Sequence, residues 1–487
     1  MAKAIMIQGT MSNVGKSYVT AGLLRVFMQD GLKTAPFKSQ NMALNSFVTN
    51  EGLEMGRAQV MQAEAAGIEP SADMNPILLK PTTDVGSQVI VNGKAIGNMR
   101  AVDYFKHKQS LIPQIMSAYN RLSEKYDVIV IEGAGSPAEI NLKKNDIVNM
   151  GMAQMAKSPV LLVGDIDRGG VFAQLTGTYM LLEENEKKYI KGFVMNKFRG
   201  DKMILEPGIK MLEDICPVPV TGVLPYTPLD IDDEDSLSDR LGKKQTDEKN
   251  IFICVIKLPR ISNFTDFNML DSVDGCEVRY VDNGKELWDA DCIIIPGTKN
   301  TIADMEWLKE RKLDRMIRLM NNEGCPVVGI CGGFQMLGRK ITDDMGVEGE
   351  IKNINGLGLI DAETVMQSEK TCINGSKTLD GISGLFSVLN GSMAKGYEIH
   401  AGVTKVGDKE VICSGKNNVF GTYLHGLFDK KEFLNKFLNV LSAETGKKIS
   451  ADFSYETVKE REYDKLADMV RENMDMQAVY RILGKGM

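Results

Sequence analysis

The stretch "GTMSNVGKS", residues 9–17, follows a short apolar run and precedes a segment whose apolar residues have helical spacing. A glycine followed by Gly-Lys-Ser is typical of a phosphate-binding loop, although five residues separate the first glycine from the Gly-Lys pair instead of four. The backbone N–H groups and the dipole at the start of such a helix favour a polyphosphate. We therefore predict a nucleotide site; an ordinary glycine turn is the alternative.

The side chains of this loop have separate tasks in the prediction. Lys16 reaches the terminal phosphates, and Ser17 binds Mg²⁺. Glu132 ends a nearby apolar strand and is the expected second ligand of Mg²⁺, with a helix cap or turn residue as the alternative. The loop residues that we expect to contact the nucleotide are Gly9, Thr10, Asn13, Gly15, Lys16 and Ser17.

Other charged residues follow predicted strands of the same half. Lys38 is expected to stabilise charge on a transferring phosphoryl group, and an exposed lysine without that role is the alternative. Asp165 or Asp167 would hold a metal or substrate, and Arg168 would bind a phosphate or a substrate carboxylate. A purely structural ion pair is the alternative.

The segments beyond the loop alternate between predicted strands and helices. Short, almost entirely apolar runs suit central parallel strands that are buried on both faces. They lie within residues 3–9, 126–135, 158–170, 190–198 and 218–226. This pattern predicts an α/β domain with a mostly parallel sheet over residues 1–236.

A second α/β series follows a polar, charged stretch, residues 237–250, which we interpret as a linker. Its apolar runs predict a second α/β domain over residues 251–440. The tail, residues 441–487, has apolar residues at helical intervals. We expect a tail helix that packs on its own domain rather than one that binds a partner.

The composition excludes several classes of protein. A chain of 487 residues with 43% hydrophobic and 25% charged residues is typical of a soluble globular protein with two to three domains. A net charge of −7 argues against bulk affinity for nucleic acid or an anionic membrane. No apolar run approaches the roughly 20 residues of a membrane span. The eight cysteines are scattered, without C-x-x-C spacing, as expected in a reducing cytoplasm.

The stretch "GICGGFQMLG", residues 329–338, predicts a second chemical site. Its G-x-C-x-G pattern, between an apolar strand and a helix, matches a nucleophile elbow with cysteine in place of serine. The helix N-terminus favours the reactive thiolate of Cys331, and the N–H of Gly332 would form part of an oxyanion hole. Gly297 is the expected second donor. The alternative to a catalytic Cys331 is a small buried cysteine, and the alternative to an oxyanion role for Gly297 is a tight turn.

A cysteine nucleophile requires a base, and the chain has three histidines. His425 follows an apolar strand of the second half and is the predicted base. His107 lies in a lysine-rich segment and is expected to be solvated. His400 also ends a predicted strand, where it would line the substrate path or pack structurally.

These motifs resemble those of known families. Residues 9–17 are similar to the G-T-x-x-x-V-G-K-[ST] loop of dethiobiotin synthetase and its relatives, which phosphorylate a carboxylate-type substrate. Met11 stands where partition ATPases have a second lysine, so the resemblance implies ATP used for chemistry. Asn196 sits where related ligases use an asparagine for the base, and an N-cap role is the alternative.

The second half resembles class I, triad-type glutamine amidotransferases, through its G-x-C-x-G-x-Q elbow and downstream His425. That family places a glutamate two residues after the histidine, where this chain has Leu427. The third triad residue is therefore either absent or supplied from elsewhere. The two resemblances together imply a dethiobiotin synthetase-like phosphate-loop domain followed by an amidotransferase-like α/β domain.

The whole chain resembles the cobyric acid synthase family of cobalamin-biosynthesis amidotransferases. The matching stretches span nearly all of residues 4–429 and include "PFKSQNMALNSFVT" at 36–49, "EGAGSPAEINL" at 132–142, "GDIDRGGVFAQL" at 164–175 and "YLHGLFD" at 423–429. The resemblance implies that the b, d, e and g carboxylates of adenosylcobyrinic acid a,c-diamide are amidated to give adenosylcobyric acid. It also implies ATP, Mg²⁺ and L-glutamine, acyl phosphates, ammonia released at the cysteine–histidine site, and a cytoplasmic location.

Three other functions are alternatives to this one. A sister enzyme amidates the a and c carboxylates of cobyrinic acid, and "PFKSQNM" and "SPAEINL" favour the cobyric branch over it. A nucleotide-regulated scaffold with an inactive glutaminase half is suggested by Leu427, against which Cys331 and His425 argue. A lone dethiobiotin-type ligase leaves the second half unexplained.

Overall fold

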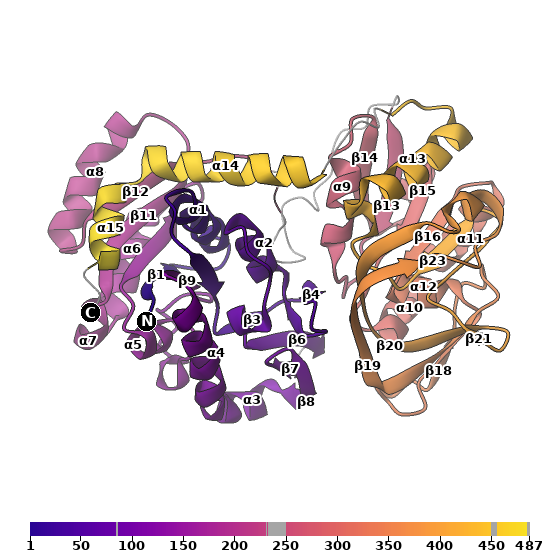
Figure 1. Cartoon of the computed structure of the whole chain (residues 1–487), viewed down its shortest axis with the longest axis horizontal. Helices are drawn as coiled ribbons and strands as arrows, with labels where there is room; N and C mark the ends of the chain where they lie inside the picture. Colours follow the sequence, from indigo (N-terminus) through magenta and orange to yellow (C-terminus); the bar gives the residue numbers. More distant parts are fainter. Residues whose placement is uncertain (84–85, 230, 232–249, 450–454, 485–487) are drawn as a thin grey trace.

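A computed structural model describes residues 1–83, 86–229, 231, 250–449 and 455–484. Figure 1 shows two bodies side by side, an indigo-to-magenta first domain and a red-to-orange second domain. The predicted linker, residues 237–250, lies outside the described residues except for its last position. Among the helices of the described ranges, none has the length and apolar character needed to cross a membrane.

The first domain is built on a six-stranded, fully parallel sheet with the order β12-β11-β10-β1-β9-β2. All residues of β9 and β10 are buried, which explains why these strands appear in the sequence as nearly continuous apolar runs. The strands are β1 (Lys3–Gly9), β2 (Thr34–Phe37), β9 (Val128–Glu132), β10 (Val160–Asp165), β11 (Ile190–Phe198) and β12 (Val220–Pro225). Its helices include α1 (Lys16–Gln29), α4 (Ile112–Lys125), α5 (Met150–Ala156), α6 (Val171–Leu181), α7 (Glu184–Lys187) and α8 (Lys202–Ile215). The prediction of a parallel α/β domain is confirmed.

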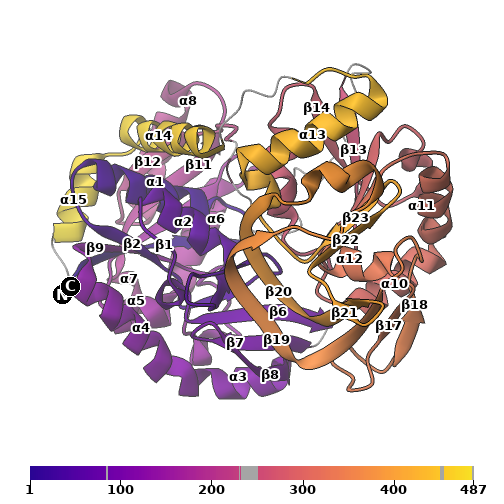
Figure 2. The ribbon, with the colours of Figure 1, turned by 45° about the vertical axis from the view of Figure 1, so that its right-hand side comes forward.

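Small sheets not predicted from the sequence follow β2. One has four strands in the order β3-β6-β7-β8, and the other is a two-stranded pair, β4-β5. The strands are β3 (Gln40–Met42), β4 (Ser46–Val48), β5 (Glu54–Gly56), β6 (Ile77–Thr83), β7 (Gly86–Val91) and β8 (Lys94–Arg100), with helices α2 (Arg57–Ala65) and α3 (Ala101–His107). Figures 1 and 2 show this region on the side of the first domain that faces the second.

The second domain has a six-stranded sheet with the order β14-β13-β15-β16-β23-β22, in which only β22 is antiparallel to its neighbour. Its strands are β13 (Ile251–Ile256), β14 (Cys276–Val281), β15 (Cys292–Ile295), β16 (Val327–Ile330), β22 (Cys413–Lys416) and β23 (Val419–Thr422). Its helices are α9 (Asn268–Asp271), α10 (Thr301–Glu310), α11 (Leu313–Asn322), α12 (Gly332–Leu337) and α13 (Lys431–Thr445). The predicted second α/β domain is confirmed.

A further sheet of the second domain, with the order β18-β17-β19-β20-β21, reaches toward the first. Its strands are β17 (Lys340–Thr342), β18 (Asn353–Asn355), β19 (Glu363–Thr378), β20 (Met393–Val406) and β21 (Lys409–Glu410). In Figure 2 the long β19 and β20 strands lie on the side of the second domain that faces the first, where they contact β4. Asn374 of β19 donates to the Val48 carbonyl at 2.7 Å, so the two domains are in direct contact.

The tail forms the expected helical structure, α14 (Tyr455–Asn473) and α15 (Met476–Gly484), but not on the domain that precedes it. It returns to the first domain, where Leu466 and Val470 are buried against α1 and Met474 lies against β12 (Figure 1). A Cβ added at Gly22 of α1 would lie 2.6 Å from Val470 Cγ2, so the two helices pack closely. Helical spacing identified the apolar face of the tail, but it carries no information about which domain covers that face.

Candidate active site

The phosphate-type loop joins β1 to α1 at the carboxyl edge of the first sheet. Gly15 is in the left-handed region with φ = +96°, and a side chain there would collide with the amide of Asn196. A Cβ at Gly9 would lie 2.6 Å from Val14 Cγ2. Asn196 Nδ2 donates to the Val14 carbonyl at 2.8 Å, and Thr10 Oγ1 donates to Gln174 at 3.1 Å. The loop with the five-residue spacing is therefore ordered before the helix. Recognition of the nucleotide's base by Asn196 stays a prediction.

Glu132 is the centre of a buried polar cluster beside this loop. Since β9 pairs with β1, the carboxylate lies next to Ser17, whose hydroxyl donates to Oε1 at 2.9 Å. Lys38 Nζ donates to the same oxygen at 2.8 Å, and Gln62 Nε2 donates to Oε2 at 2.5 Å. Lys16 Nζ donates to the Met11 carbonyl at 3.0 Å, within the loop. The structure thus brings the predicted nucleotide residues together; Gln62 is an addition that no motif indicated.

The donor set fits Mg²⁺ as nucleotide sites bind it. A serine hydroxyl and a carboxylate oxygen are hard ligands, and Mg²⁺ usually takes only one or two such protein ligands plus phosphates and water. The described residues contain no group of three or more His, Cys, Asp or Glu that could hold a metal ion by itself. Ser17 and Glu132 are therefore the residues that would hold Mg²⁺ with a bound nucleotide.

The charged residues after β10 form ion pairs beside the loop. Buried Asp165 accepts a hydrogen bond from Lys197 Nζ at 2.9 Å, and the same ammonium donates to the Asn13 carbonyl at 2.7 Å. Arg168 Nε lies 3.9 Å from Asp165, and Asp167 pairs with Arg199 at 2.9 Å. These contacts are structural ion pairs, the alternative given for these residues. A role for Asp165, Asp167 or Arg168 in substrate binding stays a prediction.

Cys331 has the strained backbone of a nucleophile elbow. It lies between β16 and α12 with φ = +52° and ψ = −108°, and its N–H donates to the Thr422 carbonyl at 2.8 Å. A Cβ at Gly329 would lie 2.6 Å from the Gly333 carbonyl oxygen, and a Cβ at Gly333 would collide with the Ile295 carbonyl of β15, the neighbour of β16 in the sheet. Glycine is required at both positions because the turn is sharp and crowded.

His425 lies at the end of β23, the strand that pairs with β16, so the histidine and Cys331 occupy the same edge of the sheet and line one cavity. Its ring is fully buried, and Nδ1 lies 2.6 Å from Asp266 Oδ2. Nε2 has no hydrogen-bond partner of ordinary geometry among the described residues, which leaves it for the thiol and the substrate. Burial alone would lower the pKa of His425, but the Asp266 carboxylate and the Cys331 side chain raise it to about 10.

Leu427, which stands where the family has its glutamate, is buried in the core, whereas Asp266 contacts the base. The aspartate lies in the 3₁₀ turn Phe264–Phe267 after β13, and its second oxygen accepts the Gly426 N–H at 3.0 Å. It is therefore the candidate for the third triad residue. Its only signal in the sequence is its place after a parallel strand, at the edge where Cys331 and His425 also lie.

Replacing Asp266 by asparagine is expected to lower kcat for glutamine hydrolysis on the order of 10³-fold, because the imidazolium loses its counter-charge and its orientation. KM for glutamine should stay close to that of the wild type, since Asp266 does not line the cavity. Steady-state glutamate release checks both values. Asp291→Asn, at the opposite edge of the sheet, is the matched control; a kcat within twofold of the wild type in Asp266→Asn would contradict the assignment.

The same variant should show a pH-dependent loss of stability. The native pKa of His425 is raised from 6.5 to about 10, so the pair stabilises the fold fully below pH 6.5 and this contribution is lost as the pH rises through about 10. The Tm difference between wild type and Asp266→Asn should accordingly be largest near about pH 6 and shrink toward pH 10. A difference that grows with pH would show that His425 is not the group involved.

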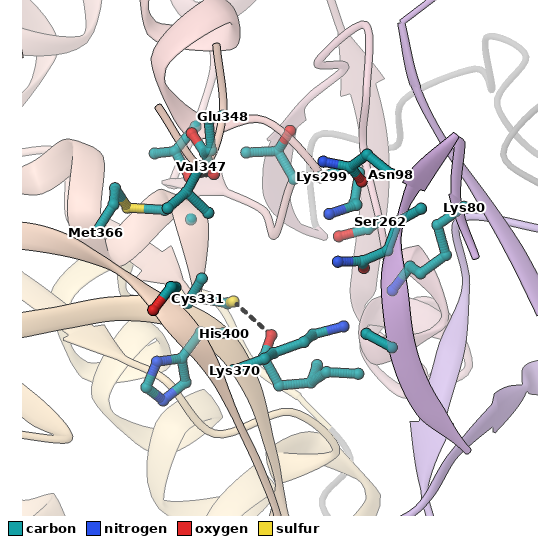
Figure 3. A pocket seen from close by; sticks show the side chains of 18 of the residues that line it. Lys80, Asn98, Ser262, Lys299, Cys331, Val347, Glu348, Met366, Lys370 and His400 are labelled. Carbon is teal, nitrogen blue, oxygen red and sulfur yellow. Dashed lines mark hydrogen bonds between the residues drawn. The ribbon is translucent and has the colours of Figure 1, made fainter. Parts of the chain in front are cut away.

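The cavity has a volume of about 500 Å³, within the usual range for small-molecule sites. Both domains line it: Figure 3 shows Cys331 and His400 facing Lys80 and Asn98 of the first domain. Gly332 lines it too, as expected of an oxyanion donor. Gly297 lies beside His425, since a Cβ there would be 3.1 Å from His425 Cε1. Donation of the Gly297 and Gly332 N–H groups to an oxyanion stays a prediction.

The other two histidines differ from His425. His400 lines the cavity, but Nδ1 lies 2.7 Å from the Gly402 carbonyl, Nε2 lies 3.3 Å from Glu398, and the ring stacks on Tyr423. Because both nitrogens are engaged, His400 is suited to a wall position rather than to proton transfer. His107 is exposed and contacts Ser110, in agreement with the solvated position predicted for it.

Comparison with known proteins covers both domains. Residues 5–238 match the family of CobQ/CobB/MinD/ParA nucleotide-binding domains, and residues 252–433 match CobB/CobQ-like glutamine amidotransferase domains. The chain is 52% identical to the cobyric acid synthase of Lachnoclostridium phytofermentans, with 100% of each chain covered. It is 53% identical to that of Ruminiclostridium cellulolyticum, over 100% of this chain and 98% of the relative.

The chain belongs to the cobyric acid synthase family. A third member, from a Thermoanaerobacter species, is 49% identical over 99% of both chains. Membership in this family, together with the two matched domains, confirms the prediction of a glutamine-hydrolysing, ATP-dependent amide ligase of cobalamin biosynthesis. The individual site residues stand on the geometry described above.

Proposed function

We propose that this protein amidates the b, d, e and g carboxylates of adenosylcobyrinic acid a,c-diamide to give adenosylcobyric acid. The observation that carries the proposal is the pairing of two sites in one chain. Cys331, His425 and Asp266 form a cysteine-nucleophile site, and the first domain presents a phosphate-type loop with Ser17 and Glu132 in contact. The full-length relatives at about 50% identity, named cobyric acid synthase, support this substrate over that of the sister enzyme.

Glutamine hydrolysis at Cys331 would follow from the polar contacts in the cavity. The Cys331 thiol gives its proton to His425, which lines the same cavity, and the sulfur then attacks the side-chain amide carbon of glutamine. The N–H of Gly332, with Gly297 as the second donor, stabilises the oxyanion. His425 then gives its proton to the leaving nitrogen, so that ammonia departs and a thioester remains. Water, deprotonated by His425, hydrolyses the thioester to glutamate.

Amide formation would take place at the carboxyl edge of the first sheet. A carboxylate needs activation because hydroxide is a poor leaving group, and transfer of the terminal phosphate of ATP to a carboxylate oxygen gives an acyl phosphate. Lys16 and Lys38 are placed to stabilise charge on the transferring group, and Ser17 and Glu132 to hold Mg²⁺, which neutralises phosphate charge when bound. Ammonia displaces phosphate from the acyl carbon, forming the amide.

The contact between the domains supports use of the ammonia inside the protein. Lys80, Gln88 and Asn98 of the first domain form part of the cavity wall around Cys331 (Figure 3), so ammonia is released where the two domains meet. Enclosure limits protonation and loss to solvent. A cytoplasmic location is part of the proposal, because all eight cysteines are unpaired, as in reducing compartments.

The contacts of His425 favour an active glutaminase half over a scaffold with an inactive one. Leu427 suggested the scaffold, and the Asp266 carboxylate, 2.6 Å from His425 Nδ1, supports Asp266 as the third triad residue. The sister activity on the a and c carboxylates is distinguished by the number of amides added.

Oxygen transfer tests the acyl phosphate step. With a corrinoid whose free carboxylates carry ¹⁸O, each amide formed should place one ¹⁸O atom in inorganic phosphate, because the bridging oxygen leaves with phosphorus. The isotope shift of phosphate in ³¹P spectra measures this. Ammonia in place of glutamine should give the same transfer, and amide formation with unlabelled phosphate would contradict the proposed activation.

A further inference from the structure

The loop after β9 leads from the nucleotide site to the protein surface. It spans residues 133–146 and follows Glu132, the expected Mg²⁺ ligand. The Gly135 carbonyl accepts a hydrogen bond from Lys16 Nζ at 3.4 Å. Backbone hydrogen bonds within residues 138–146 fold the far half of the loop into successive turns. One end of the loop therefore lies where an acyl phosphate would form.

The far end of the loop packs against the helix α3. Asn145 Nδ2 donates to the Phe105 carbonyl at 3.3 Å. The helix is also tied to the nucleotide site by a second contact, because the Tyr104 hydroxyl donates at 2.6 Å to Gln40 Oε1, two residues after Lys38. The loop and α3 thus form one continuous surface beside the site of carboxylate activation.

Three large apolar side chains on this surface are exposed to solvent. Val102 is 65% exposed, Ile140 is 60% exposed and Leu142 is 44% exposed. Single exposed apolar residues are ordinary, but a group of them beside a reaction site suits a ligand with an apolar body. We name residues 100–108 and 135–146 the loop–helix surface.

The loop–helix surface also carries positive charge. It contains five lysine and arginine residues and three acids, in a chain whose net charge is −7. Two of the acids are already engaged: Asp103 pairs with Arg100 at 2.8 Å, and Asp146 accepts three backbone N–H groups. Lys106 and Lys144 are exposed to solvent. The surface therefore suits a ligand that is both apolar and anionic.

The proposed substrate has this chemistry and makes a further demand. Four carboxylates at different positions around one macrocycle have to reach the same phosphate site in turn. A deep pocket with fixed donors would hold the ring in a single orientation. An apolar surface bordered by lysines accepts several orientations, because a lysine ammonium is a point charge on a flexible stem and can meet a carboxylate from different directions.

We propose that the loop–helix surface binds the corrinoid while one of its carboxylates is activated. Ile140 and Leu142 contact the ring, and Lys106 and Lys144 pair with carboxylates that are not being activated. The inference rests on the proposed function, whose substrate site it locates. Each amidation removes one negative charge from the corrinoid, so the attraction of the lysines weakens stepwise and the fully amidated product is released.

The double variant Lys106→Gln/Lys144→Gln tests the proposal, because both side chains are exposed and the fold does not depend on them. With ammonia as the nitrogen source, KM for adenosylcobyrinic acid a,c-diamide should rise about 10-fold, with kcat within twofold of the wild type. KM should also depend less on salt concentration than in the wild type, because two screened attractions are gone. Equilibrium dialysis without nucleotide, read by corrinoid absorbance, should show a matching rise in Kd.

A second variant separates the apolar contact from the charges. Ile140→Asn should raise KM and Kd for the corrinoid about 5-fold, because an apolar side chain no longer covers the ring. The salt dependence should stay that of the wild type, since both lysines remain. A change in salt dependence without a change in affinity would contradict the place given to Ile140.

Lys33→Gln/Lys125→Gln is the matched control for the charge change. These exposed lysines precede β2 and β9, so they lie at the amino edge of the sheet, opposite the loop–helix surface. The control should keep the wild-type KM and Kd. Unchanged values in Lys106→Gln/Lys144→Gln, an equal rise in the control, or a wild type that binds no corrinoid in dialysis would overturn the proposal. Failure of the proposed function is a separate result, in which the wild type binds the corrinoid but adds no amide.

Discussion

Replacing Cys331 by serine is expected to reduce glutamine-dependent amidation by more than about 10³-fold while leaving amidation with added ammonia near the wild-type rate. The thiol lines the same cavity as His425, and its elbow backbone puts it at the start of α12. A serine hydroxyl in the same place is a much weaker nucleophile, because its proton is far harder to remove. Ammonia supplied from solution bypasses this step.

The rates with the two nitrogen sources separate the roles of the domains. Amide formation is measured with glutamine and with an ammonium salt at a pH where free ammonia is abundant. Cys325→Ser is the matched control, since that half-buried thiol donates to the Ala290 carbonyl and a hydroxyl can do the same. Retained glutamine-dependent turnover in Cys331→Ser would show that the elbow is not the glutaminase nucleophile.

Replacing Lys16 by alanine should abolish amidation with both nitrogen sources, by about 10³-fold or more. The buried Lys16 ammonium donates to the Met11 carbonyl inside the loop and to the Gly135 carbonyl at 3.4 Å, so it lies where terminal phosphates would bind. Without it, negative charge on the transferring phosphoryl group loses the cation that the loop supplies. Glutamine hydrolysis in the absence of nucleotide should persist, because the cysteine site does not contain Lys16.

A binding measurement distinguishes lost chemistry from a lost fold. Mg-ATP should raise the Tm of the wild type, because a ligand that binds only the native state stabilises it, and this shift should be much smaller in Lys16→Ala. Lys125→Ala, an exposed change in the same domain, should keep both the shift and the activity. Wild-type amidation by Lys16→Ala would place the nucleotide elsewhere.

The two motifs could be predicted from the sequence because each is local. In both, a buried strand, a glycine-rich turn and a helix follow one another within about 20 residues, and the backbone demands of the turn determine the residue types. Glu132 could be anticipated in the same way from the end of its strand. These predictions needed no knowledge of how distant segments pack.

The parts of the site that could not be predicted from the sequence come from segments far apart in the chain. Asp266 lies 159 residues before His425 in the chain, and the contact between the domains joins Val48 to Asn374, 326 residues later. No spacing rule connects such positions; only the order of strands in the second sheet and the contact between domains do. The tail shows the same limit, since its apolar face was evident while its partner α1 lies more than 400 residues away.

The short strands β3, β4 and β5 could not be predicted for a different reason. Strands β3, β4 and β5 have three residues each, too short for an alternating pattern to be distinguished from a loop. Their stretch, residues 36–49, was instead noted because it resembles the family. The structure gives that stretch a physical role, since Lys38 contacts Glu132 and Val48 contacts the second domain.

The mass of the corrinoid product tests the central claim most directly. Purified protein would be incubated with Mg-ATP, glutamine and adenosylcobyrinic acid a,c-diamide, and the corrinoid analysed over time. We expect stepwise conversion to a product with four additional amides, together with glutamate and phosphate in matching amounts. An unchanged corrinoid, with glutamine still hydrolysed, would contradict the proposed substrate and assign the two sites to another carboxylic acid.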